Sequence, residues 1–111
     1  ASAHNGAEFP EYCASKGGVL AYTKNVALRV AKYGATCNSI SAGGVITELN
    51  AHILENKSLW DQVMAETLIP KWATVEEMAE WTYFLAVVNK SMTAQDVLID
   101  NGEIAKANFV W

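Results

Sequence analysis

Apolar side chains recur every three or four residues between about Tyr12 and Lys32, which is the period of an α-helix with one apolar face. The stripe consists of Val19, Tyr22, Val26 and Val30, with alanines at the neighbouring positions. Gly34 follows where a helix typically ends in a left-handed glycine. The pattern therefore predicts a helix over about residues 12–32 with a glycine at its C-terminal end.

Two short segments have the pattern of buried strands. Residues 35–41 (ATCNSIS) lead into the turn Ala42-Gly43-Gly44, although Asn38 and two serines interrupt the apolar pattern. Near the other end of the chain, residues 97–99 (VLI) precede the turn signal Asn101-Gly102. Each segment is short enough, and sufficiently bounded by turn residues, to favour a strand over a helix.

The chain between these strands has a helical pattern. Residues 45–73 contain apolar residues without strand alternation, and breaks near Asn56 and Pro70 favour short helices. A cleaner helix is predicted from Thr74, because TVEE at 74–77 has the spacing of a capping box, in which Thr and Glu each satisfy the other's backbone N–H. Its expected apolar stripe is Met78, Trp81, Leu85 and Val88.

The resulting order is helix, strand, several helices and strand, which is typical of parallel crossovers in an α/β sheet. A parallel pair of strands is normally covered on both faces and is not stable alone in water. The fold class predicted from the pattern is therefore α/β, with further strands expected from outside this chain.

Composition narrows the function classes. The length of 111 residues falls within the usual range for one globular domain. The net charge is −4 and the eight basic residues are scattered, which argues against nucleic acid as a main partner. No apolar run approaches the roughly 20 residues that span a bilayer. The N-terminal residues do not have the pattern of a signal peptide, and we expect a cytoplasmic protein without a membrane partner. Because the sequence does not begin with Met, we also expect a processed product or a fragment of a longer protein.

The cysteines and histidines predict neither a disulfide framework nor a metal site. Cys13 and Cys37 are too few for a framework, so thiols in a reducing compartment are favoured. Neither His4 nor His52 stands at metal-ligand spacing from them, and we therefore expect no bound metal.

Tyr12 and Lys16 stand four residues apart in EYCASKGG, and positions i and i+4 of a helix share one face. An ammonium near a phenol favours the phenolate, which suits a tyrosine to general acid–base catalysis near neutral pH. The same spacing also occurs on ordinary solvated helix faces. From these two residues alone, a proton-transfer pair and a polar helix surface both remain open.

The surrounding sequence resembles the second half of the short-chain dehydrogenase/reductase family. Tyr-x-x-x-Lys at 12–16 is followed by Asn38-Ser39-Ile40, a glycine turn and Thr47, and TAQDVLIDNG at 93–102 is similar to the family's closing strand and turn. The resemblance covers about residues 9–103. It implies the C-terminal half of a doubly wound, Rossmann-like parallel sheet that is incomplete without an N-terminal half.

By resemblance, Tyr12 would exchange a proton with the substrate oxygen, and Lys16 would favour its phenolate and bind the nicotinamide ribose. Gly43, Val45 and Thr47 would contact the cofactor, NAD or NADP. The implied reaction is hydride transfer between the cofactor and a small carbonyl compound or secondary alcohol. The family also implies a homo-oligomer, either a dimer or a tetramer.

Several features depart from the family pattern. The family's catalytic serine precedes the tyrosine by a dozen or more residues, and Ser2, the only candidate here, stands ten residues ahead. The chain has no G-x-G-x-x-G turn for the cofactor pyrophosphate. Alanine at 42 replaces a frequent proline, and Ala94 and Asn101 replace frequent glycines. We therefore expect the chain to be inactive alone; the alternative is a non-catalytic remnant or a self-associating structural fragment.

Two further groups of residues leave alternatives open. Gly17 and Gly18 lower helix propensity and either permit close packing against a neighbouring helix or are simply tolerated. The region of about residues 45–73 corresponds to the family's variable substrate loop. Its apolar residues form either core or a substrate lid, and the candidate lid residues are Leu49, Ile53, Trp60 and Met64.

Overall fold

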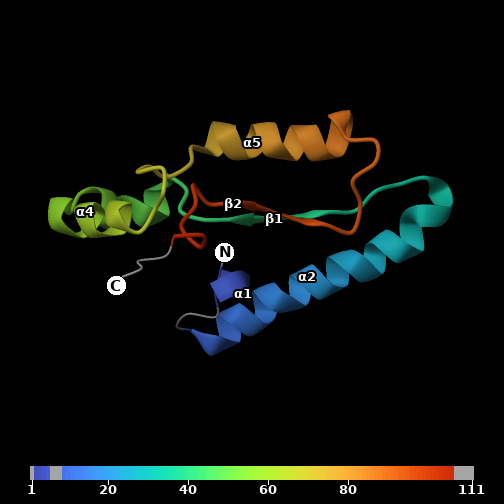
Figure 1. Ribbon diagram of the computed structural model, residues 1–111, viewed down its shortest axis with the longest axis horizontal. Helices are drawn as coiled ribbons and strands as arrows, with labels where there is room; N and C mark the ends of the chain where they lie inside the picture. Colours follow the sequence, from blue (N-terminus) through green and yellow to red (C-terminus); the bar gives the residue numbers. More distant parts are fainter. Residues whose placement is uncertain (1, 6–8, 107–111) are drawn as a thin grey trace, which may run out of the picture.

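The structure, a computed structural model, describes residues 2–5 and 9–106. The long helix α2 lies on one face of two parallel strands, β1 and β2, and α5 lies on the opposite face (Figure 1). The elements in chain order are α1 (Ser2–Asn5), α2 (Pro10–Val30), η1 (Ala31–Tyr33), β1 (Ser39–Ala42), η2 (Glu48–Asn50), α3 (Ala51–Leu54), α4 (Lys57–Ala65), α5 (Val75–Tyr83), the π-helical turn η3 (Phe84–Val88) and β2 (Asp96–Ile99).

The predicted α/β class and its parallel strands are confirmed. Ser39 pairs with Asp96 and Ala42 with Ile99, so the two strands run in register over four residues. The first strand is shorter than predicted, because the backbone at 37 pairs with side-chain and loop groups instead of a ladder: Cys37 N donates to Thr93 Oγ1 at 3.1 Å, and Ala94 N donates to Cys37 O at 2.8 Å. In β2, Leu98 is partly exposed, as expected for an edge strand with one paired side.

The predicted helices form with small shifts. After α2 the chain tightens into η1 and ends at Gly34, whose φ of 70° is the left-handed value that glycine adopts readily. Asn56 caps α4, since its side chain accepts a hydrogen bond from Leu59 N at 3.1 Å. The predicted break near Asn56 is therefore confirmed with its physical cause.

The capping box at α5 forms only in part. Thr74 Oγ1 accepts from Glu77 N at 3.1 Å, but the Glu77 carboxylate accepts from Lys71 Nζ at 2.6 Å, which places it in an ion pair outside the box. The predicted apolar stripe of this helix is also only half right. Met78 and Leu85 are half-buried, whereas Trp81 and Val88 are exposed; Val88 lies in η3, where the π-helical turn adds a residue and shifts the helix phase.

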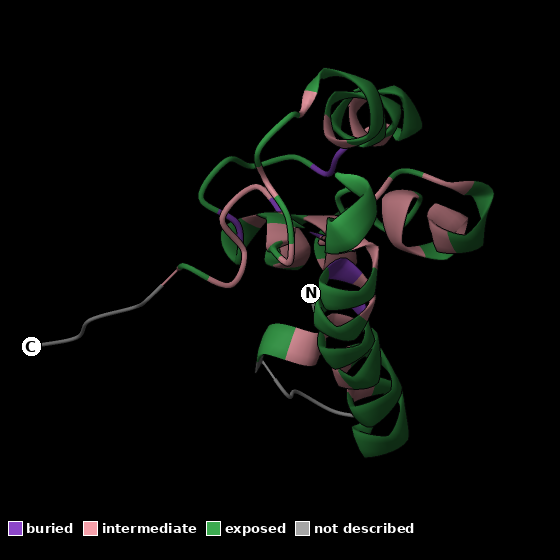
Figure 2. Ribbon diagram, turned by 90° about the vertical axis from the view of Figure 1, so that its right-hand side faces the viewer, coloured by how far each residue is buried: buried purple, intermediate pink, exposed green. Residues whose placement is uncertain are grey.

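Buried positions are few, and the helices are largely exposed (Figure 2). The buried apolar residues of the described part are Ala27, Trp72 and Ala73. Gly17 and Gly18 have no other part of the chain within 4 Å of where a side chain would begin. The described part of the chain therefore supplies no packing neighbour for these two glycines. No described helix combines the length and the apolar character that crossing a membrane requires.

Candidate active site

Helix α2 places Tyr12 and Lys16 one turn apart on the same face, as their spacing predicts. Lys16 Nζ lies 5.3 Å from the centroid of the Tyr12 ring, within the range of a cation–π contact. Pro10 occupies the first turn of the helix, where its missing N–H costs no hydrogen bond. The pair therefore sits near the N-terminal end of a regular helix, and Tyr12 is 52% exposed.

A cavity of about 210 Å³ lies between this helix face and β1. Ligands of α/β sheets bind at the carboxyl ends of the parallel strands, which is where β1 ends at Ala42. The cavity thus brings the candidate proton-transfer pair to the expected edge of the sheet. Its lining residues are Ala3, Tyr12, Lys16, Val19, Leu20, Ser39, Ile40, Ser41 and Ala42.

The turn after β1 lies against the turn after β2. A side chain at Gly43 would begin 2.7 Å from Asp100 Cβ, so only glycine allows this approach. Asn50 Nδ2 donates to Val45 O at 2.8 Å and lies 3.3 Å from Thr47 Oγ1. The side chain of Asn50 thereby stabilises the segment of residues 45–47, in which cofactor contacts are predicted.

Two carboxylates lie beside this turn. Asp100 is buried and accepts hydrogen bonds from Gly102 N and Ile104 N, both at 2.9 Å. Burial raises the pKa of the Glu103 carboxyl, and the neighbouring charges of Asp100 and Glu66 raise the pKa further. The loop after β2 therefore places two acidic groups beside the glycine turn that follows β1.

A polar cluster centred on Asp96 shares the face of the sheet that α2 covers. Asp96 accepts hydrogen bonds from Ser39 Oγ at 2.7 Å, Ser41 Oγ at 3.0 Å and His4 Nε2 at 2.6 Å. Burial alone would raise the pKa of the Asp96 carboxyl, but these hydrogen bonds and the His4 charge hold the pKa below its ordinary value. Because Ser39 and Ser41 also line the cavity of Tyr12, the cluster borders the candidate site.

Sequence reasoning missed this cluster. The available signal was an acidic residue, Asp96, directly before the apolar run of a buried strand, together with two serines at alternate positions of the other strand. Alternate residues of a strand face the same side. The parallel register that places Ser39 beside Asp96 is a tertiary feature, since 57 residues separate them.

The remaining predicted site residues are spread over the helices after the turn. Leu49, in η2, is 84% exposed, whereas Ile53 on α3 and both Trp60 and Met64 on α4 are half-buried. Ser2 begins α1, and its side chain lies outside the described residues. The structure therefore brings Tyr12 and Lys16 to one cavity, and none of the candidate lid residues lines that cavity.

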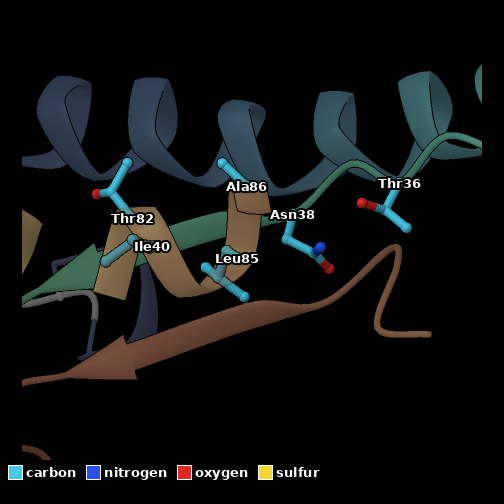
Figure 3. A pocket seen from close by; sticks show the side chains of 6 residues that line it. All are labelled: Thr36, Asn38, Ile40, Thr82, Leu85 and Ala86. Carbon is cyan, nitrogen blue, oxygen red and sulfur yellow. The ribbon is translucent and has the colours of Figure 1, made fainter. Parts of the chain in front are cut away.

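A second cavity, of about 300 Å³, lies between β1 and the helical segment of α5 and η3 (Figure 3). Its lining residues are Thr36, Asn38, Ile40, Thr82, Leu85 and Ala86, none of which titrates. Asn38 is already engaged, since its Nδ2 donates to Met92 O and its Oδ1 accepts from Gln95 N. The candidate acid–base residues Tyr12 and Lys16 line the smaller of these two cavities. Within the described residues, no group of three or more His, Cys, Asp or Glu side chains is arranged to hold a metal ion.

A model of the protein family described as enoyl-(acyl carrier protein) reductase matches residues 1–103. A solved short-chain dehydrogenase family protein from Francisella tularensis superposes with a TM-score of 0.75 and 30% identity over 86% of this chain and 43% of its own. The chain belongs to the short-chain dehydrogenase/reductase family. Its two-strand sheet is part of that family's Rossmann-like fold.

Two other members of the short-chain dehydrogenase/reductase family show what such proteins bind. L-rhamnose 1-dehydrogenase (NADP(+)) of Thermoplasma acidophilum is 28% identical over 91% of this chain and 41% of its own length. The structure of 4-hydroxyisoleucine dehydrogenase complexed with NADH superposes with a TM-score of 0.78 and 27% identity, over 86% of this chain and 40% of that one. The chain thus spans less than half the length of these relatives.

Proposed function

We propose that this chain supplies the catalytic half of an NAD(P)-dependent oxidoreductase that interconverts a small carbonyl compound and a secondary alcohol. The observation that carries the proposal is the shared cavity, in which Tyr12 and Lys16 of α2 lie against the carboxyl end of β1. A single domain would be completed by a half outside residues 1–111, with about residues 45–73 as its substrate lid. Family membership and the relatives' cofactors support this assignment.

The residues present fit the nicotinamide half of the cofactor. Gly43 presents bare backbone, because a Cβ there would fill the space against Asp100. Lys16 would bind the ribose, and Val45 and Thr47 would hold the carboxamide and phosphate end. When bound, the nicotinamide supplies or accepts the hydride. The pyrophosphate and adenosine would bind outside this chain, which has no G-x-G-x-x-G turn.

Tyr12 then moves the proton. In reduction its hydroxyl donates a proton to the substrate oxygen, and in oxidation its phenolate removes that proton. Lys16 stabilises the phenolate by its positive charge, and its Nζ already lies 5.3 Å from the ring centroid of Tyr12. The Ser39 and Ser41 hydroxyls, held by Asp96, keep the neighbouring wall of the cavity polar.

The test replaces Tyr12 by phenylalanine in the enzyme that contains this chain. Because general acid–base catalysis contributes about 10²–10⁴-fold, Tyr12→Phe should reduce kcat by at least about 10²-fold while NAD(P)H still binds. Steady-state NAD(P)H oxidation with a ketone measures kcat, and a fluorescence titration with NAD(P)H measures cofactor binding. Tyr22→Phe, on the same helix and 70% exposed, is the matched control and should keep full turnover. Turnover retained by Tyr12→Phe would refute the assigned role.

A self-associating structural role is the alternative that a specific observation favours. Helix α2 exposes Tyr22 and Leu28, and Tyr33 follows in η1 with a similar exposure. Exposed apolar side chains of this size would be buried by contact with a second copy of the chain. A homo-oligomer of the chain that neither binds nor oxidises NAD(P)H, even with its complementary half, would support this role over catalysis.

A further inference from the structure

Trp72 is the largest apolar side chain buried in the described part of the chain, with 8% exposure. Its indole lies directly over Gly44, where a side chain would begin only 2.2 Å from Trp72 Cε2 and Nε1. The indole therefore occupies the space that a residue 44 side chain would take. Gly44 belongs to the turn between β1 and Thr47, so this tryptophan packs on the proposed cofactor segment.

The backbone around Trp72 is hydrogen-bonded to the same turn. Ala73 N donates to Gly44 O at 3.0 Å, and Ile46 N donates to Ala73 O at 2.9 Å. Val45 and Ala73 form an isolated parallel bridge. Trp72 is thus held at the turn in two ways. Its indole packs on Gly44, and the next residue, Ala73, makes backbone hydrogen bonds with Gly44 and Ile46.

Trp60 connects this contact to α4. The two indole rings meet edge to face, with centroids 5.3 Å apart and an interplanar angle of 79°. This is a favourable arrangement for aromatic pairs. Neither tryptophan lines the cavity of Tyr12 and Lys16, so any effect on that site passes through the turn.

We propose that Trp72 is a positioning residue for the cofactor turn and that Trp60 couples the position of α4 to it. The inference rests on the proposed function. By filling the space over Gly44, Trp72 holds the backbone of residues 44–47 in the shape that receives the nicotinamide end. Movement of α4, through the edge-to-face contact of Trp60, then changes cofactor affinity without touching the reacting atoms.

The test measures cofactor affinity in the enzyme that contains this chain, by titrating NADH and NADPH and following nicotinamide fluorescence. Trp72→Ala should raise the Kd by about tenfold or more, equivalent to ~1.4 kcal/mol. At saturating cofactor, kcat should fall much less than Kd rises. Trp72→Phe, which keeps an aromatic ring on Gly44, should restore most of the affinity. Trp60→Ala removes only the half-buried partner and should weaken binding in the same direction.

Near-ultraviolet circular dichroism supplies a readout that does not depend on turnover. The contribution of the indole pair should disappear in both Trp60→Phe and Trp72→Phe. Trp81→Phe is the matched control, because Trp81 lies on α5 against Phe84 and away from the turn. It should change neither the pair signal nor the Kd.

The outcomes separate the two ideas. If the wild-type enzyme does not bind NADH or NADPH, the proposed function fails and the positioning role fails with it. If the wild type binds cofactor and the variants Trp60→Ala and Trp72→Ala, both folded by circular dichroism, bind it with the same Kd, only the positioning role is overturned. Should Trp72→Ala fail to fold, an unchanged Kd in Trp60→Ala overturns the coupling of α4 to the turn.

Discussion

Ala94 holds a left-handed backbone conformation with φ of 60°, just before β2 begins. For a residue with a Cβ this conformation costs roughly 1–2 kcal/mol. Asn101, with φ of 55°, tolerates it better, because Asn is enriched in this region. Ala94 and Asn101, which stand where the family often has glycine, thus both adopt the left-handed conformation that glycine tolerates best.

Ala94→Gly should therefore stabilise the protein. We expect the free energy of unfolding to rise by about 0.5–1 kcal/mol, because relief of strain exceeds the extra entropy that glycine gives the unfolded chain. Urea unfolding measures this change. Ala79→Gly, in the exposed interior of α5, is the control and should lower the same quantity by about 0.5–1 kcal/mol. Equal losses in both variants would contradict the assignment.

Asp96 makes the acid stability of the protein testable. Hydrogen bonds from Ser39, Ser41 and His4 favour its charged form and lower its pKa, despite burial. Its stabilising contribution is therefore complete above the ordinary aspartate pKa of about 3.9 and is lost as the pH falls through the lower, folded-state pKa. Asp96→Asn should reduce the melting temperature at pH 7 and approach the wild type as the pH falls below the folded-state pKa of Asp96.

Thermal unfolding between pH 7 and pH 2 measures this difference. Asp61→Asn, in an exposed i,i+4 ion pair with Lys57, controls for the loss of one negative charge and should have a small effect. A constant gap between Asp96→Asn and the wild type across the whole pH range would show that the carboxylate is not what stabilises the cluster.

At the scale of elements, the start of α5 depends on one side chain. Thr74 satisfies Glu77 N, while Glu77 itself pairs with Lys71, so only the threonine half of the capping box stabilises the helix end. Thr74→Ala should lower the free energy of unfolding by about 1 kcal/mol. The measurement is urea unfolding followed by far-ultraviolet circular dichroism.

Thr82→Ala is the matched control for this cap. Thr82 is an exposed residue of the same helix and donates to Met78 O, a contact that slightly opposes helix formation. Its removal should be neutral or weakly stabilising. A loss as large as that of Thr74→Ala would mean that the two hydroxyls act through packing and not through capping.

At the scale of the whole molecule, the chain is less compact than a folded domain of the same length. Its accessible surface is 7867 Å², whereas a compact monomer of this size exposes about 6,000 Å². Its radius of gyration is 16.0 Å, against about 13 Å for a compact domain of this length. Apolar side chains such as Phe84 and Val87 face outward because nothing in the described chain covers that side of the helix.

We accordingly predict that the 111-residue chain by itself shows no cofactor-dependent turnover and binds a dye specific for exposed apolar surface. Addition of the complementary half should abolish dye binding and restore NAD(P)H oxidation, because it covers the open faces and supplies the pyrophosphate site. Dye fluorescence and a ketone-dependent NAD(P)H assay measure both effects. Turnover by the chain alone would contradict the prediction.

The local pattern by itself determined the helices, their caps and the shared face of Tyr12 and Lys16, because each depends on residues within a few positions of one another. Asn56 marks the start of α4, and Gly34 marks the end of the helical segment formed by α2 and η1. These features follow from hydrogen bonds and side-chain spacing inside one segment.

Tertiary structure alone decided the rest. Three features involve partners that the local pattern does not specify. They are the strand register that places Asp96 beside Ser39 and Ser41, the packing of Trp72 on Gly44, and the pairing of Glu77 with Lys71 in place of a full capping box. The four-residue shift of the strand start arises in the same way, since Cys37 pairs with Thr93 and Ala94 instead of forming a strand ladder. The sequence thus predicted Tyr12 and Lys16 as a proton-transfer pair, and the fold decided what surrounds them.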